Sequence, residues 1–316
     1  MPMQRIVPPP AANHWLLPLI IPFLLILGCE DEQIRWKTEH VDRMLVVEGS
    51  LTNEKKVHRI RLSTSADYFD NKETPRVSGA QVTVTSQLDT FRFEELPDQE
   101  GVYTTTSEVA GKTGQTYRLD IHLPEPIRGQ THYHASETMI KGIDLDAIEA
   151  YLYENPIYVE ESPMDSLILY VTAYGEEPSG IRNYYAVNLF RNNKALKDTI
   201  DEVDIYSDTE ELEGDYINYL FFFEHFQPGD TVGLELATVS KAYRKYVTGL
   251  KNIVNQSGNP FDMSGPPANA IGNMEGGESL GFFRVSYVSK ARSVVQDRRE
   301  QMIKKKQSKE KNRRSP

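Results

Sequence analysis

The chain has 316 residues, with 35 Lys and Arg against 46 Asp and Glu, and a formal net charge of −11 at pH 7. This acidic balance argues against a nucleic-acid-binding protein, because nucleic acids require a basic surface. Cys29 is the only cysteine, so packing must stabilise the fold without an internal disulfide. Aromatic residues favour strands, and 17 Tyr and 12 Phe predict a β-rich protein.

Residues 1–28 have the pattern of a signal peptide. One basic side chain, Arg5, precedes a mostly apolar segment at 15–27, which is shorter than the roughly 20 residues that a membrane-spanning helix needs. The run Leu-Ile-Leu-Gly-Cys at 25–29 resembles a bacterial lipobox. The resemblance implies cleavage before Cys29 and a sulfur that carries lipid, with palmitate among the acyl chains. The alternative is an ordinary secretory signal in which the cysteine is incidental.

Three acids, Glu30, Asp31 and Glu32, follow the cysteine directly. This run resembles the export signal that sends Bacteroidetes-type lipoproteins to the outer face of the outer membrane. It implies an outer-membrane, lipid-anchored protein that faces the cell exterior. The alternative is a solvated tether, in which acids are common in any case.

Residues 29–142 are predicted to form an N-terminal β-sandwich domain of immunoglobulin-like or transthyretin-like type. The first run is mostly apolar, and in the later ones apolar and polar residues alternate, which is typical of strands with one buried face; turn residues separate the runs. The runs lie at 44–49, 59–63, 80–85, 91–94 and 117–123.

Residues 143–290 are predicted to form a C-terminal β-rich domain. Its first part, 143–165, has the acids and prolines of a connector. Strand candidates follow at 166–174, 183–190, 216–223, 231–239 and 280–288. One helix is expected over 241–253, because Ser240 can cap it and apolar residues recur at spacings of three and four. This apolar stripe comprises Tyr243, Tyr246, Val247, Leu250 and Val254. The expected fold is therefore mostly β, with two sandwich-like domains and one helix.

Charge is divided unevenly along the chain. Residues 29–289 hold 23 Lys and Arg against 43 acids, a net charge of −20, whereas residues 290–316 hold 11 against three, a net charge of +8. We expect residues 291–316 to form a basic tail, disordered or a frayed helix, outside the folded core. The tail either binds anionic lipid or an acidic partner, or is a solvated end.

Several motifs, in this order, resemble one known family. They are "LVVEGSLTN" at 45–53, "SGAQVTVT" at 78–85, "GVYTT" at 101–105, "GKTGQTYRLDI" at 111–121, "RNYYAVNLF" at 182–190 and the Gly- and Pro-rich stretch at 258–283. Together they look like the Bacteroidetes outer-membrane lipoproteins of the domain of unknown function DUF4249. The resemblance implies a surface lipoprotein that often accompanies TonB-dependent receptors, with no catalytic residues to carry over. The basic tail departs from the family pattern.

Candidate chemistry in the sequence is sparse. His132 and His134 share one face of a strand and could hold zinc if His122 paired alongside, but we favour surface histidines. The acids Asp201, Asp204 and Asp208 lack the glycine and closing glutamate of a calcium loop, so a solvated acidic loop is preferred. The sequence Gly-x-Ser-x-Gly occurs at 277–281, but a strand candidate follows it instead of the helix that a nucleophile elbow requires. We therefore predict no enzyme, no cofactor and no metal.

The loop at 257–279 is the most distinctive irregular segment. Long ordered loops on β-scaffolds often carry function. Asn259, Pro260 and Phe261 offer an aromatic between turn formers, and Gly276 and Gly277 permit close backbone approach. The loop either contacts a partner or ligand, or plugs one end of the second sandwich by burying Phe261 and Met274; we favour the plug.

The sequence thus predicts a non-enzymatic surface lipoprotein, an accessory or ligand-capturing subunit beside a TonB-dependent transporter. The alternative is a structural or adhesive surface lipoprotein without a transporter partner. The transporter follows from the family resemblance alone, whereas the anchor and the β-architecture follow from the residues.

Overall fold

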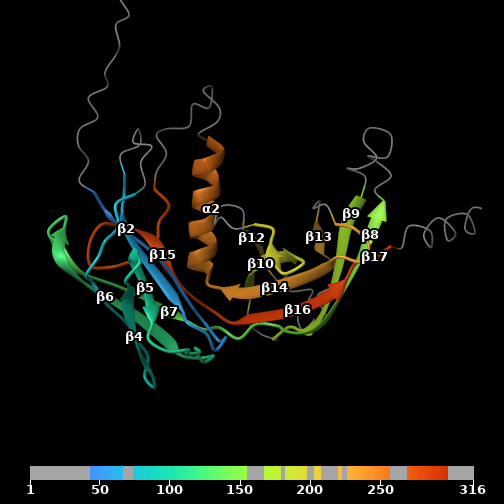
Figure 1. Cartoon of the computed structure of the whole chain (residues 1–316), viewed down its shortest axis with the longest axis horizontal. Coiled ribbons are helices and arrows are strands. Elements are labelled where there is room, and N and C mark those ends of the chain that lie inside the picture. Colours follow the sequence, from blue (N-terminus) through green and yellow to red (C-terminus); the bar gives the residue numbers. More distant parts are fainter. Residues whose placement is uncertain are drawn as a thin grey trace, which may run out of the picture. The chain divides into compact units, whose positions relative to one another are not determined.

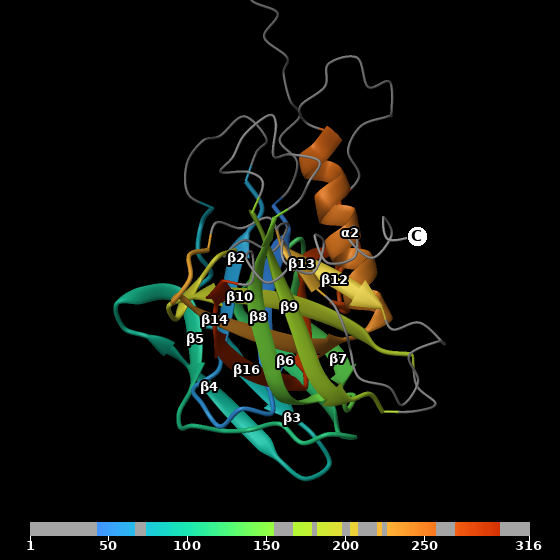
Figure 2. The same ribbon diagram turned by 90° about the vertical axis from the view of Figure 1, so that its right-hand side faces the viewer.

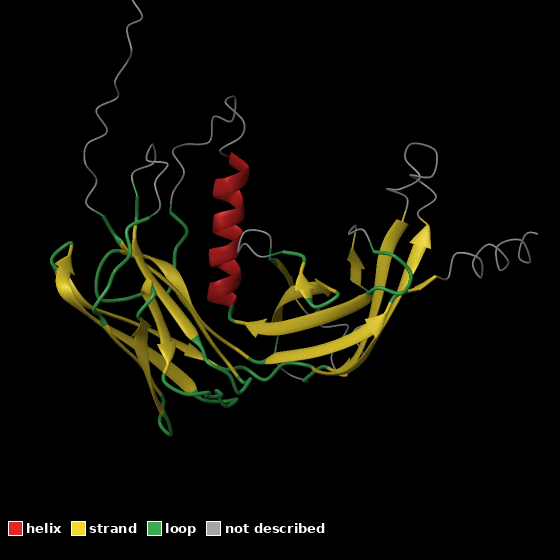
Figure 3. Ribbon diagram, viewed as in Figure 1, coloured by secondary structure: helices red, strands yellow, loops and turns green. Residues whose placement is uncertain are grey.

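The computed structural model describes residues 43–66, 74–154, 167–178, 182–197, 203–207, 220–222, 226–256 and 269–297. Figure 1 shows these residues as coloured ribbons, and Figure 3 colours them by secondary structure. They form three β-sheets and one helix. The predicted mostly β class with a single helix is confirmed for the described part of the chain.

The first sheet has eight strands in the order β15-β1-β2-β5-β4-β3-β6-β7. The strands are β1 (Leu45–Thr52), β2 (Arg59–Thr64), β3 (Gln81–Thr85), β4 (Thr90–Leu96), β5 (Gln99–Thr105), β6 (Thr116–Ile127), β7 (Gln130–Thr138) and β15 (Ser279–Ser286). Neighbours in this sheet are antiparallel except β1 and β15, which run parallel from the pair Leu45–Ser279 to the pair Thr52–Ser286. A parallel pair of strands needs a long connection between them. Here the pair brings the first strand of the described chain next to a strand close to its end.

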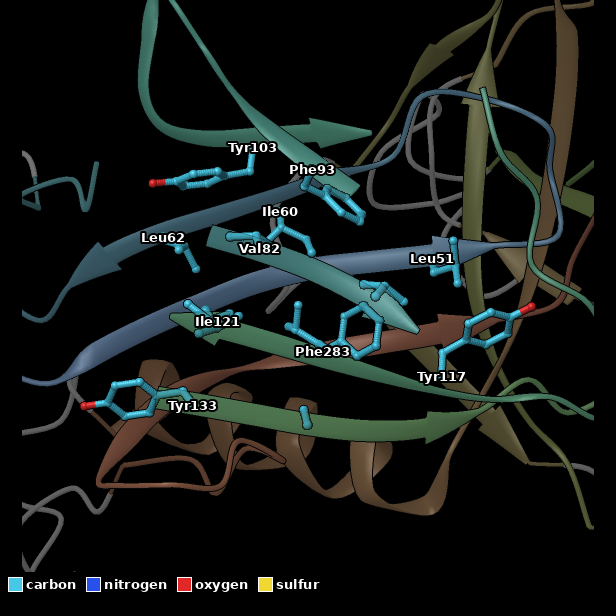
Figure 4. Packing of buried hydrophobic residues seen from close by; sticks show 14 of the residues in the cluster. Leu51, Ile60, Leu62, Val82, Phe93, Tyr103, Tyr117, Ile121, Tyr133 and Phe283 are labelled. Carbon is cyan, nitrogen blue, oxygen red and sulfur yellow. The ribbon is translucent and has the colours of Figure 1, made fainter. Parts of the chain in front are cut away.

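All eight strands contribute to one hydrophobic core (Figure 4). In β6 the residues Tyr117, Leu119 and Ile121 are fully buried, and the residues between them are not, as period-two alternation requires. Buried tyrosines in this core keep a hydrogen-bonded hydroxyl. The hydroxyl of Tyr103 donates to the Val77 carbonyl and accepts from the Ala80 amide, both at 2.9 Å.

The segment before β15 also contacts the opposite edge of the sheet. Glu275 and His134 of β7 exchange backbone hydrogen bonds of 2.7 and 2.9 Å. Met274 packs against the same core as both edge strands. The sheet therefore curls towards a closed, barrel-like arrangement in which part of its β7 edge is paired.

The other two sheets pack around a second core. One contains β10 (Tyr184–Arg191), β11 (Lys194–Ala195), β12 (Asp204–Ser207), β14 (Thr231–Val239) and β16 (Val288–Val294). The other contains β8 (Asp144–Glu154), β9 (Leu167–Glu176), β13 (Leu220–Phe222) and β17 (Gln296–Asp297), and Figure 2 shows β8 and β9 side by side. Alternate residues of both sheets share this core, including Ile148, Leu169, Val187 and Leu234. The two sheets thus form the predicted sandwich.

The helix α2 (Lys241–Gln256) covers the other face of the β10–β14 sheet. Ser240 caps it as expected, because its Oγ accepts a 3.1 Å hydrogen bond from the Tyr243 amide. The predicted apolar stripe is correct from Tyr243 to Leu250. It is wrong at Val254, which is 52% exposed and is not part of the buried cluster that the rest of the stripe joins.

Two sequence-based boundaries in this part of the chain differ from the structure. Residues 144–154 form β8 and not a connector, because Ile148, Ala150 and Leu152 alternate into the second core. The last predicted strand lies at 279–286 and pairs with β1 of the N-terminal segment. Contacts group 42–316 as one compact unit. The division into domains at 29–142 and 143–290 stays a prediction, and β15, which it assigns to the second domain, pairs with β1 of the first.

The basic tail was predicted to begin at residue 291, and this boundary is wrong. Strand β16 continues to Val294, and Val295 is 2% exposed in the second core. The apolar residues Val294 and Val295 interrupt the charged pattern, and β14 and β8 pair with this segment. Residues 298–316 lie outside the described part of the chain.

The two adjacent valines allow a direct test of this corrected boundary. We expect Val295→Ala to lower the free energy of unfolding by about 2 kcal/mol, because it removes buried methyl groups and leaves a cavity. The matched control, Val294→Ala, should cost less than about 0.5 kcal/mol, since Val294 is 54% exposed. Urea denaturation measures both. Equal effects of the two substitutions would contradict a folded residue 295.

Candidate functional site

A groove of about 400 Å³ opens where the outer face of the first sheet meets helix α2 and strand β10. Its cationic lining comprises Arg59, Arg61, Lys197 and Arg284, and Glu48 is its one lining carboxylate. We call it the arginine groove. Its volume lies within the range of small-molecule sites.

Strand register places these side chains together. Glu48 of β1 pairs with Arg61 of β2 on one side and with Phe282 of β15 on the other. Arg59 lies two residues before Arg61 and therefore shares its face. Arg284 pairs with Ser50, which is two residues after Glu48 and also lines the groove. The two strands that flank β1 thus present three guanidinium groups to one side of the sheet.

The aromatic wall of the groove comes from α2 and β15. Phe282 packs edge-on against Tyr243 with ring centroids 5.1 Å apart, and its ring lies 5.4 Å from that of Tyr246. The guanidinium carbon of Arg284 lies 5.4 Å above the Tyr243 ring, within cation–π range. Burial, with the charge of Glu48 and the neighbouring Tyr243, raises the pKa of Tyr246 to about 12. The Tyr246 hydroxyl is therefore neutral at physiological pH.

Two of the cations have acidic partners. Arg61 Nη1 lies 3.5 Å from Glu48 Oε2, in an exposed pair of modest strength. Lys197 Nζ lies 2.9 Å from Asp204, which Lys251 shares at 3.3 Å. Burial alone would raise the pKa of Asp204, but the hydrogen bonds and charges of Lys197 and Lys251 outweigh it and lower that pKa. The lining therefore offers charged hydrogen-bond donors beside an apolar aromatic surface, a combination suited to binding a small molecule.

The predicted loop residues are only partly placed. Asn259, Pro260 and Phe261, like the lipidation candidate Cys29, lie outside the described residues. Gly276 and Gly277 approach β7 closely: a Cβ on Gly276 would clash with the His132 carbonyl, and one on Gly277 would meet Gln130 at 2.9 Å. The two glycines therefore permit close approach to strand β7 of the same chain. Met274 packs against the first core, not the second as the plug hypothesis expected.

The structure brings the three predicted histidines close together. His122 does pair with His132, and their rings stack at 4.2 Å with an angle of 1° between planes. The Nε2 atoms of His132 and His134 each lie 3.1 Å from a carboxylate, of Asp120 and Glu275 respectively. Within the described residues, no three His, Cys, Asp or Glu side chains are arranged to hold a metal ion.

Asp204 is the one member of the predicted acidic trio that the structure describes. Asp201 and Asp208 lie outside the described residues. The carboxylate of Asp204 is occupied by Lys197 and Lys251. It therefore holds β12 against α2 and the β11 turn through two ion pairs.

Sequence reasoning missed the arginine groove. Arg59 and Arg61 were visible as the polar members of an alternating strand. Their meeting with Arg284 depends on the parallel register of β1 and β15, which no local pattern encodes. The available signal was the recurrence of arginine at outward positions of strands in an otherwise acidic chain.

The fold and the groove together define a mostly β protein with a small-molecule-sized cationic site. The chain belongs to the family described as Domain of unknown function (DUF4249), whose model matches residues 31–292. Membership of DUF4249, expected from the sequence motifs, is thereby confirmed. No curated protein matches the chain.

Among solved structures, the chain is similar to a Ca²⁺-stabilised adhesin that helps an Antarctic bacterium reach out and bind ice. The identity is 11% and the TM-score 0.21, and the match covers 80% of this chain and 48% of that one. This chain therefore spans about half the adhesin's length, and at this TM-score the likeness carries no argument. In the part of the chain that the structure describes, no helix has the length and apolar character to cross a membrane.

Proposed function

We propose that this chain is a lipid-anchored outer-membrane surface protein that captures a ligand as a non-enzymatic accessory of a TonB-dependent transport system. The observation that carries ligand capture is the arginine groove, because a solvent-open site of about 400 Å³ with four cations is suited to binding a small molecule. The anchor is supported by the lipobox-like run that ends at Cys29 and by the acids that follow it. The transporter is supported by the family resemblance.

We expect Cys29→Ser to abolish lipidation. The serine hydroxyl cannot replace the thiol that the lipobox resemblance makes the acyl acceptor, so the chain should remain uncleaved or leave the outer membrane. Metabolic labelling with a fatty-acid analogue, followed by membrane fractionation, measures both effects. Thr38→Ser is the control, because it is a small substitution outside the lipobox. Equal labelling of Cys29→Ser and the control would refute the anchor.

The transporter partner is tested by affinity capture of the tagged chain from detergent-solubilised outer membranes. We expect a TonB-dependent receptor to be enriched with the wild-type chain compared with an unrelated tagged lipoprotein. Recovery of the lipidated chain without such a receptor would instead favour the structural or adhesive alternative. Parallel capture with an Arg59→Gln/Arg284→Gln variant shows whether any partner needs the groove.

A further inference from the structure

We propose that the arginine groove binds small molecules that carry two or more anionic groups, as carboxylates, phosphates or sulfates. This inference rests on the proposed ligand-capturing function and names the ligand class of the same site. Three features carry it: the local excess of cations, the lack of acidic partners for two of them, and the arrangement of the donors.

The charge of the groove is opposite to that of the body around it. Residues 29–289 carry a net charge of −20, yet the groove is lined by four cations and one carboxylate. Salt screens charges beyond about 8 Å at physiological ionic strength. A bound ligand therefore responds mainly to the lining charges and to Asp204, which pairs with Lys197 at 2.9 Å, and the distant carboxylates repel it only weakly.

Arg59 and Arg284 have no carboxylate partner among the described residues. The side chain of Arg59 is exposed and forms no ion pair there, and that of Arg284 lies over the Tyr243 ring and likewise forms no ion pair there. Several other cations among the described residues do form ion pairs, as Lys290 does with Glu54 and Glu235 at 2.8 and 2.9 Å. Two unpaired guanidinium groups at one groove leave their fork-shaped donors available to an external anion.

The spacing of the arginines favours more than one anionic group. Arg59 and Arg61 lie on β2 and Arg284 lies on β15, with β1 between these strands. Neighbouring strands are about 4.8 Å apart, so the two sides are separated by about 10 Å at the backbone. A monovalent anion would engage one side, whereas a ligand with two anionic groups can engage both. The Ser50 hydroxyl, which also lines the groove, can orient the part between.

The test is calorimetric titration of the purified full chain with a panel of charged and neutral probes. The charged probes are citrate for carboxylates, pyrophosphate for phosphates and a disulfated disaccharide for sulfates; the neutral probes are glucose and cellobiose. We expect at least one charged probe to bind, with affinity that falls as salt rises, and the neutral probes to bind at least tenfold more weakly. Comparison among the charged probes identifies which anionic group is preferred.

The variant Arg59→Gln/Arg284→Gln should weaken binding of the preferred probe at least tenfold. The matched control is Arg43→Gln/Arg92→Gln, which removes the same charge from exposed arginines outside the groove and should leave the affinity unchanged. Thermal unfolding of both variants confirms that each is folded. The inference is overturned if no charged probe binds, if neutral probes bind as tightly, or if both double variants lose affinity equally.

These outcomes are separable from the proposed function. A neutral probe that binds and is lost in Arg59→Gln/Arg284→Gln would leave ligand capture standing and refute only the anionic class. Anion binding by the purified chain needs neither a membrane nor a transporter, so failure of the Cys29 or capture experiments does not affect this result.

Discussion

Replacing Gly281 by alanine should destabilise the protein by about 3–5 kcal/mol, among the largest effects expected of a single methyl group. Gly281 lies in β15 directly opposite Val47 of β1, with φ +92. A Cβ at this position would collide with the Val47 carbonyl oxygen and lie 2.8 Å from its amide nitrogen. Both atoms belong to the backbone of the parallel pair, so the clash can be relieved only by separating the strands.

Gly129 provides a control that separates strain from collision. It also has a positive φ, +77, but a Cβ there meets nothing within 4 Å. Gly129→Ala should therefore cost only the left-handed backbone penalty, roughly 1–2 kcal/mol. Chemical denaturation compares the two variants. If Gly281→Ala costs no more than Gly129→Ala, the close parallel pairing of β1 and β15 is wrong.

The same strand pair shows where sequence reasoning stops. Alternation within β3 and β6 predicted strands, because burial on one face leaves a period of two in the sequence. In β15, by contrast, both Phe282 and Phe283 are buried, one against α2 and the other in the first core. A strand covered on both faces loses its alternation, and its partner lies more than two hundred residues away. Neither fact leaves a local signal.

Strand β8 was missed for a different reason. Its buried positions Ile148, Ala150 and Leu152 do alternate, but acids such as Glu149 stand between them and prolines follow. Acids and prolines are depleted in strands, so composition outweighed periodicity in the prediction of a connector. Tertiary packing against the β10–β14 sheet reverses this preference, because the acids of the outward face remain in water.

The helix was predicted almost completely, because its signals are local. A capping serine and a 3.6-residue apolar stripe lie within one short segment. The arginine groove is the opposite case. Its members come from β1, β2, β10, β15 and α2, and only the tertiary fold brings them together. The residue types were visible in the sequence, but their arrangement was not.

We expect the contribution of Glu137 to the free energy of unfolding to decrease as the pH rises from about 4.5 to 7. It lies in β7, is 8% exposed, and accepts hydrogen bonds from Ser240 Oγ at 3.2 Å and Asn273 Nδ2 at 3.4 Å. Burial raises the pKa of Glu137 from its ordinary value of 4.5 to about 7, and these two hydrogen bonds offset only part of that increase. The carboxyl thus connects β7, the cap of α2 and the segment before β15.

The direction of the effect follows from proton binding. Between the unfolded pKa of about 4.5 and the folded pKa of about 7, the folded state binds more protons than the unfolded state. The stabilisation is therefore complete below about pH 4.5 and is lost as the pH rises through the folded value. A shift of this size corresponds to about 3 kcal/mol as an order of magnitude.

Glu137→Gln isolates this effect, because glutamine keeps an acceptor for Ser240 and Asn273 and cannot ionise. We expect the variant to have nearly wild-type stability at pH 4 and to be more stable than wild type by up to about 3 kcal/mol at pH 8. Urea denaturation across this pH range measures the difference between the two chains. Because both chains share every other titrating group, the difference reports Glu137 alone. The control, Glu94→Gln on the exposed face of β4, should show no such pH-dependent difference. A Glu137→Gln variant that is less stable than wild type at pH 8 would show instead that the ionised carboxylate stabilises the junction of β7 and α2.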